Sequence, residues 1–305
     1  MSSILILEQS LNGLQFGLML FLIAAGLTLV FGIMNMINLA HGSLYMTGAF
    51  VAASLSQLTG SFVAGMLLSL LITAVIGILL EMAFLRRLYE RDHLSQVLAT
   101  FALILITNEA VRIVWGPDMP MNMPDALAGP IEIFPGMIYP SYRLMIIGVG
   151  LAVAGLLYLI IVKTRIGMQI RAGASNRMMA GVMGGNIKVL FTLVFGVGAA
   201  LCALAGALLG PILAVQIGMG ENILILTFVV IVIGGIGSIR GALLGAILVG
   251  MVDTMGRAFL PAFFGMVLPA DVSSAIGPAL ASILIYVLMA AVLFWKPNGL
   301  FPARG

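Results

Sequence analysis

Few side chains in this sequence could do covalent chemistry. The 305 residues include two histidines, His41 and His93, and a single cysteine, Cys202. The sequence has no His-Glu-x-x-His zinc motif, no Gly-x-Ser-x-Gly nucleophile turn and no Gly-x-x-x-x-Gly-Lys-Ser/Thr phosphate loop. A lone cysteine offers neither a disulfide framework nor a metal-binding pair, so Cys202 is expected to be a small packing residue. We therefore expect a protein that is not an enzyme and that binds no metal or cofactor itself.

Two polar interruptions of long apolar runs are more informative. The first reads NMINLAHG over residues 35–42, and the second reads GGIGSIRG over residues 234–241. Polar side chains are costly in lipid unless they face protein or water, and transporters use broken helices to bind solutes. The candidate residues for a translocation path are Asn35, Asn38, His41, Gly42, Gly235, Gly237 and Ser238. The alternative for each segment is a cytoplasmic turn, with Asn38 as a helix cap and His41 at the membrane interface, or with Arg240 as an interfacial anchor.

Two pairs of opposite charges have helical spacing. Glu109 and Arg112 are three residues apart, and Asp253 and Arg257 are four apart, so each pair can meet on one helix face. Ionisable residues inside a membrane often serve function, whereas a self-paired couple near the end of a span is more often structural. Contact with a solute is kept as the lesser alternative for both pairs.

Residues 163–188 form a basic island that contains five of the 14 Lys and Arg residues and no acidic one. Basic residues near the ends of spans resist translocation, so this island is expected on the cytoplasmic side. Small residues and methionines fill its interior, residues 171–184. They would let a short helix fit closely against another protein, because methionine offers an adaptable apolar surface. The alternative is a helix that lies on the membrane surface with its arginines at lipid phosphates.

Composition predicts the elements that position these residues. The chain is 62% hydrophobic and 8% charged, whereas a soluble domain is about a quarter charged. We therefore predict an all-α, polytopic transmembrane bundle that forms one membrane domain over residues 1–305. An eight-span arrangement is the main rival to nine spans, since one short segment could be re-entrant. The nine predicted spans are 11–33, 42–58, 61–85, 94–114, 143–162, 188–213, 222–239, 241–259 and 273–295.

Charge also predicts sidedness. The basic clusters at 86–91, at 163–188 and at the carboxyl end should be cytoplasmic, and the proline-rich loop with Asp118, Asp125 and Glu132 should be outside. Nine spans then place the amino terminus outside and the carboxyl terminus inside. Because span ends account for the basic residues, membrane lipid is the expected partner of these charges and nucleic acid is not.

Four segments carry a resemblance to a known family: INLAHGSLYMTGAF, TRIGMQIRAGASNRMMAGVMGGNI, VIGGIGSIRGALLGA and KPNGLF. Together they resemble the permease subunits of branched-chain amino acid ABC importers. The resemblance implies a bacterial inner-membrane permease for leucine, isoleucine and valine that works by alternating access. It further implies a second homologous permease, a periplasmic binding protein and two cytoplasmic ATPases that use ATP.

The resemblance also implies that residues 171–184 form a short cytoplasmic helix that docks on an ATPase. The residues implied in this coupling are Arg171, Ala172, Ala174, Asn176, Ala180 and Gly184. The sequence departs from the family pattern at Asn176, which is usually acidic, and at Gly185, which is usually a larger apolar residue. Two alternatives stay open: a permease for urea, short amides or another small polar solute, and a passive channel, which is also a glycine-rich helical bundle.

Overall fold

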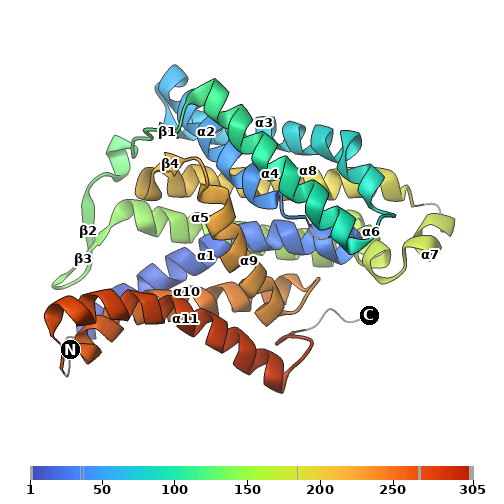
Figure 1. Ribbon diagram of the computed structural model, residues 1–305. Coiled ribbons are helices and arrows are strands. Elements are labelled where there is room, and N and C mark those ends of the chain that lie inside the picture. Colours follow the sequence, from blue (N-terminus) through green and yellow to red (C-terminus); the bar gives the residue numbers. More distant parts are fainter. Residues whose placement is uncertain (1–2, 35, 37, 184, 267–268, 302–305) are drawn as a thin grey trace.

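The computed structural model describes residues 3–34, 36, 38–183, 185–266 and 269–301, and it is a bundle of long helices (Figure 1). This confirms the predicted all-α class. The nine long helices within those residues are α1 (Ser3–Met34), α2 (His41–Thr59), α3 (Phe62–Ala83), α4 (His93–Trp115), α5 (Ser141–Lys163), α8 (Ile187–Leu213), α9 (Met219–Gly234), α10 (Ile239–Phe264) and α11 (Ala270–Trp295).

Each predicted span falls on one of these nine helices. Three boundaries differ by five residues or more: α1 begins eight residues before its predicted span, and α10 extends five residues beyond its own. The helix α9 ends at Gly234, five residues before the predicted boundary, because the glycines that follow form a turn. Among the described residues, seven helices are long and apolar enough to cross a membrane, and of the nine long helices only α2 and α9 are outside this set. The chain is thus a multi-pass membrane protein, and its predicted count of eight or nine spans is roughly consistent with this set.

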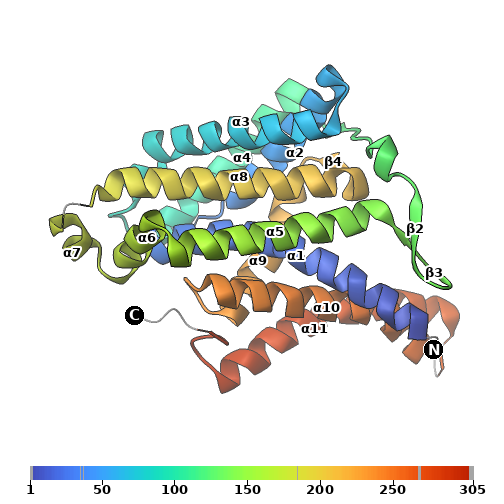
Figure 2. The ribbon, with the colours of Figure 1, turned by 180° about the vertical axis from the view of Figure 1, so that it is seen from behind.

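Glycines let the helices approach one another closely around α1. Residues of α1 from Leu18 to Val30 are almost all fully buried. A Cβ atom added to Gly17 would lie 2.8 Å from the Ala246 carbonyl oxygen of α10, so the two backbones are in contact. Small residues at such crossings are typical of membrane helices, because close packing replaces the hydrophobic driving force that is missing in lipid. The helix α4 covers one side of the bundle (Figure 1), and α5 and α8 cover the opposite side (Figure 2).

The two ends of the bundle differ. One end, called here the hairpin end, carries the antiparallel pair β2 (Pro130–Phe134) and β3 (Met137–Pro140), together with the short pair β1 (Asp118–Met119) and β4 (Val215–Gln216) and the turn η2 (Asp125–Leu127). The other end, the α7 end, carries η1 (Leu85–Leu88), α6 (Arg165–Ser175) and α7 (Arg177–Val182).

The described chain begins at the hairpin end and finishes at the α7 end (Figures 1 and 2). The acidic loop and the basic island are therefore at opposite ends, as the charge pattern predicts. Which end faces the cytoplasm stays a prediction.

Candidate functional site

The first polar interruption lies inside the bundle. The His41 ring lies beside Gly26 of α1 and Gly198 of α8. Gly26 is eight residues from the end of α1, about 12 Å along the helix. His41 is fully buried there. The structure therefore places His41 at depth, and not at the membrane interface as the alternative reading of this segment had it.

Asn38 and His41 bring polar atoms into this interior. The Oδ1 atom of Asn38 accepts a hydrogen bond from the Ala40 backbone N–H at 3.0 Å, and Ala40 is the residue in the cap position of α2. The Asn38 amide nitrogen has no partner among the described residues, and the two His41 ring nitrogens make no hydrogen bond of regular geometry, although the ring interacts with the Ile23 carbonyl. Unpaired polar groups are costly when buried, so these atoms suit a place where water or a polar solute passes.

Gly42 joins this interior to α9. A side chain at Gly42 would collide with the Gly220 carbonyl, so the first turns of α2 and α9 are in direct contact. Asn35, the remaining candidate in this segment, lies outside the described residues.

The second polar interruption lies at the α7 end of α1. Gly235 and Gly237 have φ values of +106° and +80°, which favour glycine and end α9 in a tight turn. Ser238 caps α10, because its Oγ atom accepts a hydrogen bond from the Gly241 N–H at 3.1 Å. A Cβ atom on Gly32 of α1 would lie 3.1 Å from Gly237 Cα. Both interruptions therefore adjoin the same half of α1, although they are 199 residues apart in sequence.

Residues 296–301, which read KPNGLF and are called here the strap, close the end of α9. The Leu300 N–H donates to the Ile233 carbonyl at 2.8 Å, and the Phe301 N–H donates to the Gly234 carbonyl at 2.9 Å. A Cβ atom on Gly299 would lie 2.5 Å from Gly235, so these two glycines let the strap and the turn touch. The strap satisfies carbonyls that the end of a helix leaves without partners.

The basic island folds as two helices, α6 and α7, where a single short helix over residues 171–184 was expected. The break is at Asn176, which has φ −152° and caps α7 by accepting a hydrogen bond from the Met179 N–H at 3.0 Å. The acidic residue usual at this position could cap a helix in the same way.

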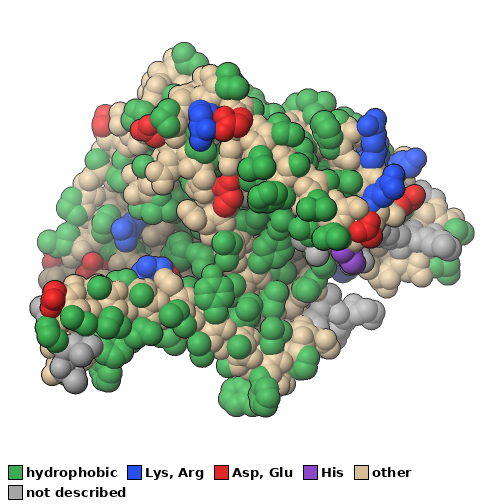
Figure 3. Space-filling model, in the orientation of Figure 1, with side chains coloured by type: hydrophobic (Ala, Val, Ile, Leu, Met, Phe, Trp, Pro, Cys, Tyr) green, Lys and Arg blue, Asp and Glu red, His purple; other side chains and the backbone are tan. Residues whose placement is uncertain are grey.

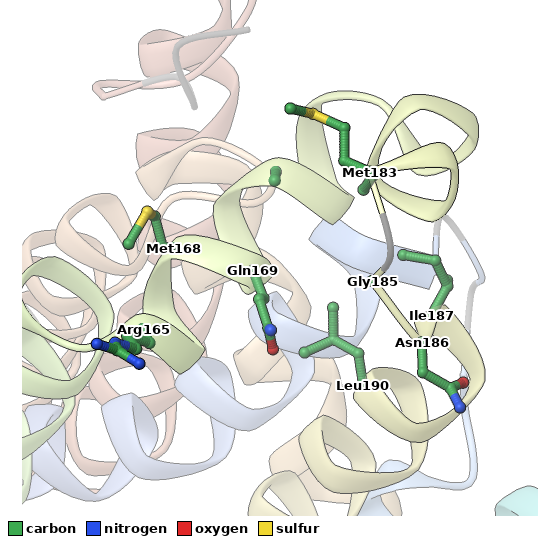
Figure 4. A pocket seen from close by; sticks show the side chains of 10 residues that line it. Arg165, Met168, Gln169, Met183, Gly185, Asn186, Ile187 and Leu190 are labelled. Carbon is green, nitrogen blue, oxygen red and sulfur yellow. The ribbon is translucent and has the colours of Figure 1, made fainter.

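An open groove of about 380 Å³ lies between α6, α7 and the first turn of α8 (Figure 4). Two of the predicted coupling residues, Ala172 and Ala180, line it. The remaining lining residues include apolar and polar side chains: Arg165, Met168, Gln169, Met183, Gly185, Asn186, Ile187 and Leu190.

The α7 segment beside this groove, residues 179–183, has an exposed apolar surface. Met179, Val182 and Met183 of the α7 segment have 60%, 80% and 86% of their surface exposed. They lie at the end of the bundle, beyond the long helices that would contact lipid (Figure 1). An adaptable apolar surface of this kind is typical of protein docking.

The other predicted coupling residues have different surroundings. Arg171 donates a hydrogen bond to the Ile161 carbonyl and so ties α6 to the end of α5. Ala174 is exposed on α6, and Gly184 lies outside the described residues. A Cβ atom on Gly185 would lie 2.8 Å from the Ala180 carbonyl oxygen, which accepts a hydrogen bond from the Gly185 N–H. A larger residue at position 185 would therefore have to move α7.

Sequence reasoning missed a buried charged network at the α7 end. The Glu81 side chain is fully buried and accepts hydrogen bonds from Arg86 at 3.0 and 3.2 Å, from the Tyr89 hydroxyl at 2.7 Å and from the Thr192 hydroxyl at 2.8 Å. These four residues, called here the Glu81 network, join α3 and η1 to the beginning of α8. The signal was present, because Glu81 is the only acidic residue in its predicted span and Arg86 follows five residues later.

The two charge pairs form as predicted but differ in setting. Glu109 and Arg112 meet at 2.6 Å, and both are exposed near the hairpin end of α4. Asp253 and Arg257 meet at 2.8 Å beside a largely open cavity of about 330 Å³ between α1 and α10. Apolar side chains cover most of the visible side of the molecule, and the charged ones gather mainly toward its ends (Figure 3).

The groups that could do covalent chemistry are dispersed. Cys202 is buried where α8 packs on α2, and this position requires a small side chain. His93 is exposed at the beginning of α4. Within the described residues, no three His, Cys, Asp or Glu side chains are grouped as a metal site would need.

Comparison with known proteins gives a family match over most of the chain. The family described as the permease component of branched-chain amino acid transport systems matches residues 9–293. BraD of Pseudomonas aeruginosa, a high-affinity branched-chain amino acid transport system permease protein, is 31% identical over 96% of this chain and 95% of its own length. LivH of Escherichia coli K12, which bears the same description, is 30% identical over 83% of this chain and 87% of its own.

A probable branched-chain amino acid transport permease, LivH of Methanocaldococcus jannaschii, is 28% identical over 81% of this chain and 80% of its own length. No solved structure matches the chain.

Proposed function

Because the chain belongs to the family of permease components of branched-chain amino acid transport systems, we propose that it is one permease subunit of an ABC importer for leucine, isoleucine and valine. It lies in the bacterial inner membrane with its α7 end in the cytoplasm, its amino terminus outside and its carboxyl terminus inside. A second, homologous permease pairs with it, and a periplasmic binding protein delivers the solute. Two cytoplasmic ATPases bind and hydrolyse ATP, and this chain has no ATP site.

The observation that carries this proposal is the exposed apolar surface of α7 beside the groove at Ala172 and Ala180. It is the surface on which an ATPase docks. ATP-driven closure of the ATPase pair moves α6 and α7, and the two permeases then alternate between outward-open and inward-open states. The polar interior at Asn38 and His41 lies on the path that the solute takes between them.

The docking surface can be tested without disturbing the fold. Val182→Asn changes a side chain that is 80% exposed, and Leu58→Asn, at an equally exposed position at the hairpin end of α2, is the matched control. We expect ATP-dependent leucine uptake to fall about tenfold in the first variant, which corresponds to a loss of about 1.4 kcal/mol of docking free energy. The control should retain uptake. Both proteins should be present in the membrane at wild-type amounts.

Three results would speak against the proposal. Equal uptake by Val182→Asn and the wild type would remove α7 as the docking surface. Uptake that persists without the ATPases would make the protein a passive channel. Transport of urea or a short amide, with none of leucine, would replace the branched-chain solute.

A further inference from the structure

We propose that the cavity beside Asp253 and Arg257 is a subsite for the charged backbone of an α-amino acid on its way through the permease. This inference rests on the proposed function, since it takes an amino acid as the solute. The cavity is lined by side chains of α1 and α10: Gln9, Phe16, Asp253, Thr254, Arg257 and Ala258. Its volume of about 330 Å³ is at the lower end of the range of small-molecule sites, roughly 300–1,000 Å³.

The pair, which lines the cavity, keeps unused hydrogen-bonding capacity. Arg257 uses Nε to bind Asp253 Oδ1 at 2.8 Å and Nη2 to bind the Ser282 hydroxyl of α11 at 3.1 Å. Within the described part of the chain, Arg257 Nη1 and Asp253 Oδ2 make no hydrogen bond. A guanidinium with a free N–H suits a carboxylate, and a carboxylate with a free oxygen suits an ammonium group. The two groups of an α-amino acid match these two positions.

The depth of the pair argues against a purely structural role. Asp253 is 11 residues from the hairpin end of α10, about 17 Å along a helix that is about 39 Å long. The Arg257 side chain is nevertheless 49% exposed. A charged side chain inside a span is costly in lipid, so an exposed guanidinium at this depth must face water or protein. The wall of a water-filled solute path meets this requirement.

Polar contacts continue from the cavity across α1. Gln9, which lines the cavity, accepts a hydrogen bond from the Asn12 amide at 3.3 Å. The Asn12 carbonyl oxygen in turn accepts from the Tyr139 hydroxyl at 3.0 Å and from Arg143 of α5 at 2.6 Å. The space-filling view shows Lys or Arg side chains in the recess above α10 and α11 near the hairpin end (Figure 3).

The charge of this region also fits a zwitterion. Glu8 and Arg143 both interact electrostatically with Tyr139. Together with the pair Asp253 and Arg257, they make two carboxylates and two guanidiniums in this region. They give no net charge. A neutral solute with separated charges is accommodated by such a surface, whereas a simple cation or anion would meet an equal number of like charges. Phe16 and Ala258 supply apolar contacts for an aliphatic side chain.

Photo-crosslinking in the assembled transporter tests the subsite directly. A diazirine analogue of leucine would be supplied to the complex through its binding protein, and the labelled peptides would be identified by mass spectrometry. We expect label on peptides that contain residues 9–16 or 254–258, and a loss of that label in excess leucine. The proposal is overturned if the analogue is transported and labels other segments only.

Substitution separates solute contact from structure. We expect Arg257→Gln to lower leucine uptake at least tenfold and to remove the label, while the purified complex keeps wild-type thermal stability and ATPase binding. The matched control is Arg112→Gln, because Arg112 belongs to the exposed pair on α4. Its uptake should stay within twofold of the wild type. Equal effects of the two substitutions would refute the subsite.

The same assay distinguishes this inference from the proposed function. If the wild-type complex does not take up leucine, the proposed function fails. If it takes up leucine and Arg257→Gln does so equally well, only the subsite fails. If Arg257→Gln loses uptake together with thermal stability, while crosslinking of the wild type misses both peptides, the pair is structural and the subsite also fails.

Discussion

The Glu81 network gives a sharp prediction about stability, because its central carboxylate is fully buried and has four hydrogen bonds. Glu81→Ala would leave the Arg86 guanidinium without its carboxylate partner and would remove the acceptor of the hydrogen bonds from the Tyr89 and Thr192 hydroxyl groups. Removing one member of a buried ion pair typically costs about 3–5 kcal/mol. Arg86 keeps 35% of its side chain exposed and can be hydrated, so we expect the lower end, about 3 kcal/mol.

Glu81→Gln isolates the charge from the shape. The glutamine amide fills the same volume, and its oxygen can still accept hydrogen bonds. Its N–H group, however, would face the donors that now bind the second carboxylate oxygen. Hydrogen bonds to charged groups contribute about 1.5–3 kcal/mol, so we expect a loss of about 2 kcal/mol. The control is Glu90→Gln, because Glu90 is an exposed carboxylate in the same loop, and such surface changes usually stay within about 0.5 kcal/mol.

The assay is reversible unfolding of the purified protein in mixed micelles of a mild detergent and a denaturing one, followed by tryptophan fluorescence. A double-mutant cycle with Arg86→Gln measures the coupling between the two charges, which we expect to be about 1–2 kcal/mol. The reasoning is refuted if Glu81→Gln is as stable as Glu90→Gln, or if the effects of Glu81→Gln and Arg86→Gln add without coupling.

Two further substitutions probe backbone contacts at the α7 end. Leu300→Pro removes the N–H that donates a hydrogen bond to the Ile233 carbonyl. In the same unfolding assay it should therefore destabilise the protein by about 1–3 kcal/mol more than Leu300→Ala does. Equal free energies of unfolding for the two variants would contradict the role of the strap. Gly185→Ala brings a methyl group within 2.8 Å of the Ala180 carbonyl, so it should displace α7 and reduce ATPase binding in a pull-down. Gly155→Ala, which meets open space, is its control, and indistinguishable binding of the two variants would show that α7 tolerates the shift.

The spans are the part of the fold that the sequence predicts well. The run predicted at 61–85 is the helix Phe62–Ala83, because an apolar stretch in lipid must satisfy its backbone groups internally and a helix does so. The charge pairs were also predictable, because side chains three or four residues apart meet on one face of a helix.

The contacts between helices could not be predicted from the sequence pattern. The depth of His41 depends on how tightly Gly26 and Gly198 let α1 and α8 approach, and a single sequence does not say which glycines face each other. The break at Asn176 was missed because the family resemblance implied one short helix over residues 171–184, although asparagine is a preferred residue at the beginning of a helix. Of the candidate path, Asn38 and His41 are buried within the bundle and Gly235 lies at its end, while their contact with a solute stays a prediction.

The strap has a consequence for biogenesis. The carbonyls of Ile233 and Gly234 receive their partners from Leu300 and Phe301, which the ribosome adds more than sixty residues later. While α10 and α11 are being inserted, the exit turn of α9 therefore lacks the hydrogen bonds that complete it, and α9 is also among the helices too short to be recognised as a span by length and composition. The turn that ends α9 is thus completed only after α11 has been synthesised and the strap has docked.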